Sequence, residues 1–296
     1  MTLPNFIVIG AAKCGTTSLV HYLAQHPQVF MSPEKEPRFF APEFFTKYIS
    51  GPIRKGTIRN EMEVEEYEGL FEDVTTEKAI GEASTEYIFF PETPKRIKEL
   101  IPDVKLIAIL RNPSDRAFSA YCFQLRDGVE PLSFEHSLHA ESKRSKEYWR
   151  PGWLYQKAGF YFEQLSRYFD VFEPNQIRVY LYEDLDKRPV ETLRDIFNFL
   201  DVDQDFIPDL SRKNVSALPK NFVLNRLLSN QSPLISLKPY LPKQLLELLR
   251  YVKKRNRKPK PKLSYELKTE LTELYKDDIL KLQTLIKKDL SHWMLH

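Results

Sequence analysis

The pattern of apolar and amphipathic stretches along this chain predicts strands that alternate with helices. Near-continuous apolar runs are typical of strands buried on both faces, and they lie at residues 6–9, 79–84, 104–110 and 177–182, with a shorter run at 29–31. Apolar residues recur at helical spacing in stretches at 16–23, 61–71, 94–100, 117–121, 158–170 and 190–200. Strands that alternate with helices predict a parallel sheet joined by right-handed crossovers.

The first apolar run leads into a loop between two glycines, Gly10 and Gly15, and then into a predicted helix. A strand, a glycine-bounded loop and a helix N-terminus direct backbone N–H groups and the positive end of the helix dipole at one spot, which suits a phosphate. The segment adds a lysine, a thiol and three hydroxyls, at Lys13, Cys14, Thr16, Thr17 and Ser18. We therefore predict an α/β, P-loop-like fold of three layers, in which helices flank a central parallel sheet. An ordinary turn of small residues is the alternative interpretation of this loop.

The glycine-bounded loop differs from the nucleoside-triphosphate pattern G-x-x-x-x-G-K-[ST] at one position. Thr16 stands where that pattern has lysine, and the lysine of this loop is Lys13. The strongest apolar run ends in Arg111, where a triphosphate enzyme needs an acidic residue for Mg²⁺. The sequence therefore favours an anion held by protein cations without a metal, and a P-loop kinase with a displaced lysine is the rival hypothesis.

A second anion site is predicted just after the strand at 104–110. Arg111 follows the strand directly, and Ser119 lies one to two helical turns further on. Ligands of open α/β sheets bind beyond the carboxyl ends of the strands, so Arg111 should reach the same edge as the glycine-bounded loop. A guanidinium fork with a hydroxyl suits a second phosphate. A salt bridge from Arg111 to Asp115 is the alternative.

The composition argues against several classes of protein, among them nucleic-acid-binding, membrane-spanning and disulfide-rich proteins. The 296 residues carry 44 Lys or Arg and 41 Asp or Glu, and a net charge of +3 is too small to indicate a nucleic-acid partner. No apolar run approaches the roughly 18 residues of a membrane-spanning helix, and the N-terminus lacks the pattern of a secretory signal. The two cysteines provide neither a disulfide framework nor metal-ligand spacing. We therefore expect a globular protein of the reducing cytoplasm.

The C-terminal third differs in composition from the rest. Residues 238–262 carry ten Lys or Arg and one Glu, and residues 250–262 could contact a polyanionic acceptor or an anionic membrane surface. An exposed charged linker is the alternative. Residues 265–293 show a helical apolar stripe that is expected to dock on the core. We predict one domain over residues 1–296, with segment 238–262 and helix 265–293 packed on it.

Three segments taken together carry a family resemblance. AAKCGTTSL, EKEPRFF and LIAILRNPSDRAFSAY resemble the nucleotide-binding and catalytic signatures of sulfotransferases. The most similar branch comprises the sulfotransferase domains of heparan-sulfate-modifying enzymes and their bacterial relatives. The resemblance implies 3′-phosphoadenosine 5′-phosphosulfate (PAPS) as the donor, adenosine 3′,5′-bisphosphate as the product and no metal.

The resemblance also implies roles for single residues. The 5′-phosphosulfate would be held by Lys13, Cys14, Gly15, Thr16, Thr17 and Ser18, with Lys13 nearest the bridging oxygen. Arg111 and Ser119 would hold the 3′-phosphate, and Arg212 and Lys213 match a late basic loop that closes over the nucleotide. Glu36 would be the general base for a hydroxyl or amine acceptor on a glycan, a lipid or a small molecule.

The chain departs from the heparan-type pattern beside this base. Arg38 stands where such enzymes often have His, and Ala83 stands where they often have Lys. Whether Arg38 or Glu82 assists Glu36 therefore stays open, as do the acceptor and the oligomeric state. A third hypothesis is a non-catalytic module that binds polyanions or membranes through its basic run.

Overall fold

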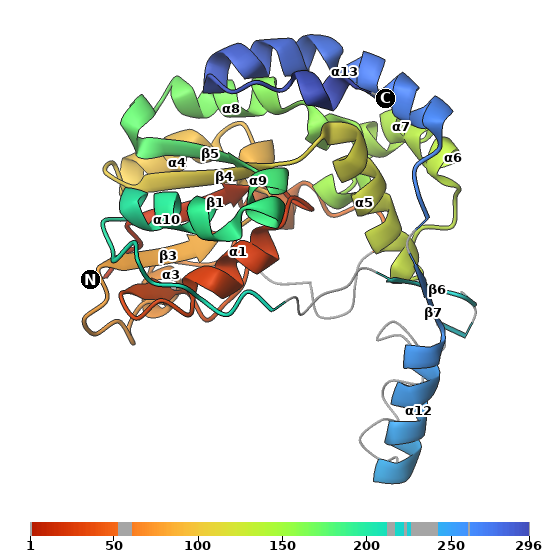
Figure 1. Cartoon of the computed structure of the whole chain (residues 1–296), viewed down its shortest axis with the longest axis horizontal. Coiled ribbons are helices and arrows are strands. Elements are labelled where there is room, and N and C mark those ends of the chain that lie inside the picture. Colours follow the sequence, from red (N-terminus) through yellow and green to blue (C-terminus); the bar gives the residue numbers. More distant parts are fainter. Residues whose placement is uncertain are drawn as a thin grey trace.

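A five-stranded parallel sheet forms the centre of the molecule (Figure 1). The computed structural model describes residues 2–52, 61–211, 217–221, 224–225, 242–259 and 261–295. The strand order is β2-β3-β1-β4-β5, with bounds β1 Phe6–Gly10, β2 Val29–Met31, β3 Ala79–Ala83, β4 Lys105–Leu110 and β5 Ile177–Leu181. All five apolar runs of the sequence form strands, and the predicted three-layer α/β fold is confirmed.

The central strand β1 is buried along its whole length. It pairs with β3 on one side and β4 on the other, with Phe6 opposite Gly81 and Lys105. A Cβ atom on Gly81 would lie 2.1 Å from Cζ of Phe6, so the aromatic ring lies directly over this glycine. The Phe6 ring can therefore pack against this strand only because Gly81 has no side chain.

Helices flank the sheet (Figure 1). Their bounds are α1 Thr16–Leu23, α2 Glu43–Thr46, α3 Val64–Gly69, α4 Thr93–Leu100, α5 Pro113–Arg126, α6 Phe134–His139, α7 Glu141–Lys146, α8 Tyr161–Phe169, α9 Tyr182–Lys187, α10 Pro189–Phe199, α12 Lys243–Arg255 and α13 Tyr265–Ile286. Short 3₁₀ turns are η1 Tyr87–Phe89, η2 Pro151–Trp153, η3 Lys157–Gly159, η4 Pro174–Gln176 and η6 Ser291–Met294. Helices α2, α6, α7, α9 and α12 were not predicted from the sequence.

The helix predicted at 265–293 ends earlier than its apolar stripe. Lys287 adopts the left-handed conformation at φ 54° and closes α13 after Ile286. The chain then turns, and η6 places Trp293 in the core. Helix α13 itself contacts α8 and α5, as expected for docking on the core.

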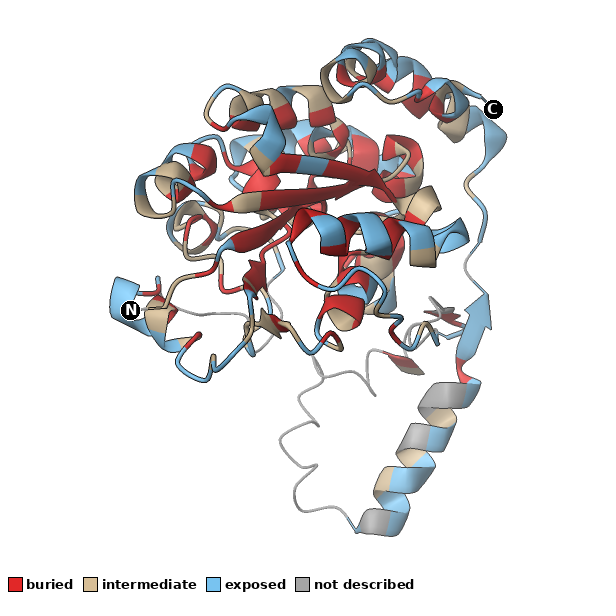
Figure 2. Cartoon of the chain, turned by 60° about the vertical axis from the view of Figure 1, so that its left-hand side comes forward, coloured by how far each residue is buried: buried red, intermediate tan, exposed pale blue. Residues whose placement is uncertain are grey.

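The described part of the basic segment, residues 242–259, forms a protrusion. Strand β6, Ala217–Pro219, pairs antiparallel with β7, Arg257–Pro259, and α12 extends from this pair away from the α/β body (Figures 1 and 2). Figure 2 shows the contrast between a buried sheet and a helix α12 with exposed and half-buried residues. The single-domain division of the chain stays a prediction.

Candidate active site

The loop between β1 and α1, called the cradle below, has the backbone geometry expected of an anion-binding loop. Gly15 lies at φ +92° and precedes the first residue of α1, while Lys13 is left-handed at φ 73°. A hydrogen bond from Ala11 N to Ile109 O, 2.8 Å long, ties the loop to the neighbouring strand β4. The loop is therefore held between two central strands of the sheet, with α1 starting from it.

The loop side chains divide into buried and accessible groups. Thr16 and Cys14 are buried, whereas Thr17 and Ser18 are exposed. The Cys14 sulfur lies 3.6 Å from the Tyr161 hydroxyl, and burial raises the pKa of this thiol, so Cys14 can offer a ligand its backbone rather than a thiolate. The Lys13 ammonium lies 3.8 Å from the centre of the Phe123 ring.

One tyrosine connects the cradle to Arg111. A Cβ atom on Gly15 would lie 2.9 Å from Cδ2 of Tyr182, and the Arg111 guanidinium lies 4.7 Å from the centre of the same ring. Tyr161 also connects the cradle to Arg111, because its hydroxyl contacts the Cys14 sulfur and donates a 3.1 Å hydrogen bond to the Arg111 carbonyl oxygen. The structure therefore brings Arg111 to the cradle, as the sequence predicted.

Ser119 lies on α5, the helix that follows Arg111, and is half-buried. The helix begins where it does because Asn112 caps it, accepting hydrogen bonds from Ser114 N at 3.0 Å and Asp115 N at 3.3 Å. Its assignment to the 3′-phosphate stays a prediction, as do the other residue roles implied by the resemblance.

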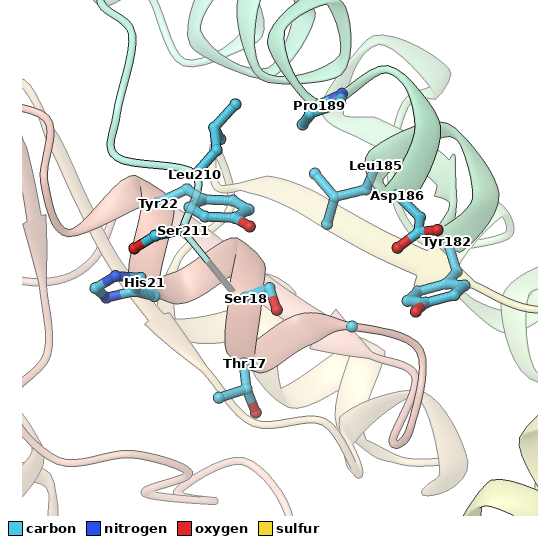
Figure 3. Close-up of a pocket in the computed structure, with 11 residues that line it drawn as sticks. Thr17, Ser18, His21, Tyr22, Tyr182, Leu185, Asp186, Pro189, Leu210 and Ser211 are labelled. Carbon is cyan, nitrogen blue, oxygen red and sulfur yellow. The ribbon is translucent and has the colours of Figure 1, made fainter. Parts of the chain in front are cut away.

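A cavity of about 310 Å³ opens beside the cradle (Figure 3). The cradle and α1 line one wall, α9 and the start of α10 line another, and the chain at Leu210 and Ser211 crosses it (Figure 3). Its lining residues are Gly15, Thr17, Ser18, His21, Tyr22, Tyr182, Leu185, Asp186, Pro189, Leu210 and Ser211. Arg212 and Lys213 continue the sequence from Ser211 but lie outside the described residues.

Glu36 lies on the loop after β2, next to the end of β3. Glu36 N donates to Ala83 O at 3.1 Å, and Arg38 N donates to Ser84 Oγ at 3.0 Å. Both residues are left-handed, at φ 59° and φ 58°. The side chain of Lys35, their neighbour, donates to Thr17 Oγ1 at 2.9 Å. This bond joins the Glu36 loop to the anion cradle.

The Glu36 carboxylate is fixed from both sides. Thr85 Oγ1 donates to Oε1 at 3.0 Å, and Arg38 Nη2 donates to Oε2. The same guanidinium donates through Nε to Glu86 Oε2 at 3.2 Å. Burial, followed by the nearby Glu86 charge, raises the pKa of Glu36, while Arg38 and Lys35 oppose the increase. A raised pKa makes Glu36 a stronger proton acceptor than an exposed glutamate.

Arg38 and Glu82 differ in how they relate to Glu36. Arg38 contacts the carboxylate directly, whereas Glu82 is fully buried and accepts a hydrogen bond from Ser84 Oγ at 3.0 Å. Burial raises the pKa of Glu82 to about 7. Glu82 therefore acts on the Glu36 loop indirectly: it accepts a hydrogen bond from the Ser84 hydroxyl, which in turn accepts one from the Arg38 backbone N–H.

Arg150 is a part of the site that sequence analysis missed. Its guanidinium and that of Arg38 both contact the Phe44 ring, at 4.9 Å and 4.3 Å from its centre. Within the described residues, Nε of Arg150 is buried without a hydrogen-bond partner. Burial and the charge of Arg38 lower the Arg150 pKa. Thr85 and Tyr182 were missed as well, because only the fold brings them to the site, and Lys35 was given no role although it directly precedes Glu36.

The described residues contain neither a metal-binding cluster nor a membrane-spanning helix. In that part of the chain, no three His, Cys, Asp or Glu side chains are grouped as ligands for a metal ion. No helix there is long and apolar enough to span a membrane.

Comparisons with known proteins agree on one family. A model described as "Sulfotransferase family" matches residues 4–206. A crystal structure of a sulfotransferase from Alicyclobacillus acidocaldarius is 35% identical, covers 100% of both chains and superposes with a TM-score of 0.80. The sulfotransferase domain from the curacin biosynthetic pathway shares the fold, with a TM-score of 0.50 at 17% identity and coverage of 98% of this chain and 100% of that one.

Curated relatives include larger proteins. Membrane-associated sulfotransferase kil1 of Dictyostelium discoideum is 27% identical over 73% of this chain. Bifunctional heparan sulfate N-deacetylase/N-sulfotransferase 3 of Mus musculus is 29% identical over 68% of this chain. The aligned regions cover 59% and 22% of these two relatives.

Proposed function

This chain belongs to the sulfotransferase family, and from that premise we propose that it transfers a sulfuryl group from PAPS to a hydroxyl or amine of an acceptor. The observation that carries the proposal is the junction of two cationic groups and one carboxylate at a single sheet edge. Tyr182 connects the cradle of Lys13 to Arg111, and the Lys35–Thr17 bond connects the cradle to the loop of Glu36.

The residues of the cradle fit the phosphosulfate end of the donor. The exposed hydroxyls of Thr17 and Ser18 and the N-terminus of α1 offer hydrogen-bond donors to its oxygens. Lys13 supplies the positive charge that stabilises the oxygen linking phosphorus to sulfur, which becomes more negative as the bond to sulfur breaks. Arg111 and Ser119 would hold the 3′-phosphate, and the adjoining cavity offers space for the rest of the nucleotide.

Glu36 fits the role of general base. The acceptor oxygen or nitrogen forms a bond to sulfur while the bond from sulfur to the 5′-phosphate breaks, and the acceptor proton passes to a Glu36 carboxylate oxygen. The acceptor hydroxyl is a weak acid, so a fixed proton acceptor contributes roughly 10²–10⁴ in rate. Thr85 and Arg38 fix the carboxylate, and its raised pKa favours proton uptake.

Glycans, lipids and small molecules all remain acceptor candidates in this proposal. The mouse relative is named for an N-sulfotransferase activity on heparan sulfate, which favours a glycan. Arg38 and the absence of a lysine at Ala83 distinguish this site from the heparan-type pattern. The donor proposal does not depend on this choice. The cytoplasmic location stays a prediction.

Binding of the product tests the donor proposal. Adenosine 3′,5′-bisphosphate at about 100 times its dissociation constant should stabilise the protein by about 2.7 kcal/mol, or about 5 °C in Tm for a chain of this size. Lys13→Ala removes a charged contact and should weaken binding about tenfold to a hundredfold. Lys276→Ala, on α13 far along the chain, is the matched control. A folded wild-type protein whose Tm does not respond to millimolar bisphosphate would contradict the proposal.

A second variant separates binding from catalysis. Glu36→Gln should retain the bisphosphate-induced Tm shift and lose about 10²–10⁴ in turnover, measured with labelled PAPS and an acceptor found by screening glycans, lipids and phenols. Glu34→Gln on the same loop is the control and should retain turnover. Unchanged turnover in Glu36→Gln would exclude this base. Transfer of phosphate from ATP that EDTA abolishes would instead support the kinase hypothesis.

A further inference from the structure

Helix α12 presents a row of large apolar side chains to solvent. Leu245, Leu248 and Tyr251 recur every three residues and are 39%, 54% and 56% exposed. Leu249 and Val252 lie on the same side of the helix and are partly buried. Residues three and four apart share a helix face, so these side chains form one continuous apolar stripe.

Hydrogen bonds hold the C-terminal end of α12 in place next to the α/β body. Asn256, which follows α12 directly, is buried and donates through Nδ2 to Asn221 O at 2.9 Å. Its own side-chain oxygen accepts from Asn221 N at 2.8 Å. The β6–β7 pair lies beside these bonds and contacts α5. The apolar stripe is therefore held away from the core rather than packed on it (Figure 2).

Positive charge is concentrated in the same segment. Residues 238–262 hold ten Lys or Arg and one Glu, so the rest of the chain holds 34 Lys or Arg against 40 Asp or Glu. The chain thus combines a strongly basic protrusion with a net acidic body. Of the described basic residues, Arg255, Arg257 and Lys258 are exposed at the end of the helix and in β7.

We propose that α12 is a membrane-surface helix that binds anionic lipid. An interfacial helix buries an apolar face at the boundary of the acyl chains while basic residues contact the headgroups, and each Lys or Arg near such a surface adds about 1 kcal/mol. The exposed leucines decide between lipid and a polyanionic glycan, because a glycan offers no apolar phase in which to bury them. The 13 residues of α12 span only about 20 Å, too short to cross a bilayer core of about 30 Å, so the helix lies on the surface.

Vesicle co-sedimentation of the full chain tests the proposal. Wild-type protein should sediment with phosphatidylcholine vesicles that contain about one third phosphatidylserine, and not with pure phosphatidylcholine vesicles. Binding should fall as salt is raised from about 0.1 M to 1 M, because the screening length shrinks from about 10 Å to 3 Å. Leu245→Gln with Leu248→Gln should weaken binding at least about tenfold, since it removes buried apolar area. Arg255→Gln should weaken it about fivefold.

The matched control replaces two exposed leucines of another helix. Leu274 and Leu280 of α13 are 43% and 44% exposed, and replacing both with Gln should leave vesicle binding unchanged. The Tm shift with adenosine 3′,5′-bisphosphate should be the same in every variant, which separates this proposal from that of the donor site. Three outcomes would overturn it: no binding to anionic vesicles, equal binding by the α12 double variant, or lipid-free self-association that the double variant abolishes.

Discussion

At the scale of the residue, the backbone fixes Glu36 before any acceptor arrives. Glu36 and Arg38 both have positive φ values, a conformation that costs a non-glycine residue of the order of 1 kcal/mol. Hydrogen bonds from both backbone amides to the β3 segment offset this cost. The carboxylate is therefore positioned by the sheet, and Arg38 completes the arrangement.

The buried carboxyl of Glu82 predicts a pH-dependent stability. The pKa of Glu82 is about 7 in the folded protein against 4.5 for an ordinary glutamate, so between these values the folded state holds a proton that the unfolded state releases. Stability should therefore decrease as pH rises from 4.5 to 7, by about 3 kcal/mol from this group. Glu82→Gln remains neutral and removes this contribution.

Urea unfolding of wild type and Glu82→Gln at pH 5 and pH 8 measures the effect. The difference in unfolding free energy between the two proteins should change in favour of the variant at the higher pH, by about 2–3 kcal/mol. All other titrating groups cancel in this comparison. The same difference at both pH values would show that Glu82 titrates normally.

Site residues could be predicted from the sequence where they lie together on one short segment. Lys13, Thr17 and Ser18 lie on one short segment, the loop after β1 and the first turn of α1, and Arg111 directly follows a strand, so the sequence placed them at one sheet edge. The contacts of Tyr182 and Arg150 could not be predicted, because each comes from an element distant in sequence that only tertiary packing brings to the site. Cys14 was grouped with the ligands, but its thiol is buried against Tyr161.

At the scale of the element, β3 and β1 meet where Gly81 faces Phe6. Gly81→Ala places a methyl group 2.1 Å from Cζ of Phe6, and overpacking of this kind costs about 1–3 kcal/mol of unfolding free energy. Combining Gly81→Ala with Phe6→Leu removes the outer ring atoms, so the double variant should be more stable than the sum of the single effects predicts.

Gly69 provides the control for this substitution. It lies at the end of α3, and a Cβ atom there would meet nothing within 4 Å. Gly69→Ala should leave stability unchanged or raise it by about 0.4–1 kcal/mol, because alanine restricts the unfolded chain. Equal losses at Gly69 and Gly81 in chemical unfolding would mean that ring contact is not the cause.

Elements could be predicted from the sequence to different degrees. Strands β1 and β4 were predictable because burial on both faces leaves an uninterrupted apolar run. Helices α6 and α7 have six residues each, too few for a clear helical period in a polar and aromatic segment. Helix α12 was not predicted because its segment was interpreted from its many basic residues, although its leucines recur at helical spacing.

At the scale of the whole molecule, Trp293 in η6 links two elements next to the proposed nucleotide site. Trp293 is buried, its carbonyl oxygen accepts from Asn112 Nδ2 at 2.9 Å and its Nε1 donates to Glu183 at 2.5 Å. Asn112 caps α5 beside Arg111, and Glu183 lies on α9 beside Tyr182. Trp293 thus connects the ends of β4 and β5, through its backbone carbonyl on one side and its indole on the other.

Trp293→Ala should therefore affect both stability and ligand binding. Loss of a buried tryptophan costs about 3–5 kcal/mol. Loss of the indole bond to Glu183 should loosen α9 beside Tyr182 and thereby weaken adenosine 3′,5′-bisphosphate binding near Arg111. Leu295→Ala, at a side chain that is 68% exposed, should change neither. Chemical unfolding and calorimetric titration of both variants check the prediction. Full bisphosphate affinity in a destabilised Trp293→Ala protein would confine the role of Trp293 to packing.

The bond from Lys35 to Thr17 Oγ1 has a consequence for the kinetics of the two substrates. In the proposed function, Thr17 contacts the donor, and Lys35 adjoins Glu36, the proposed base. A donor oxygen that accepts the Thr17 proton would share this hydroxyl with Lys35 rather than displace it, because a hydroxyl both donates and accepts. In that proposal the donor and acceptor sites are joined through one hydroxyl and one ammonium group, and binding of the nucleotide would orient the lysine beside Glu36 before the acceptor enters.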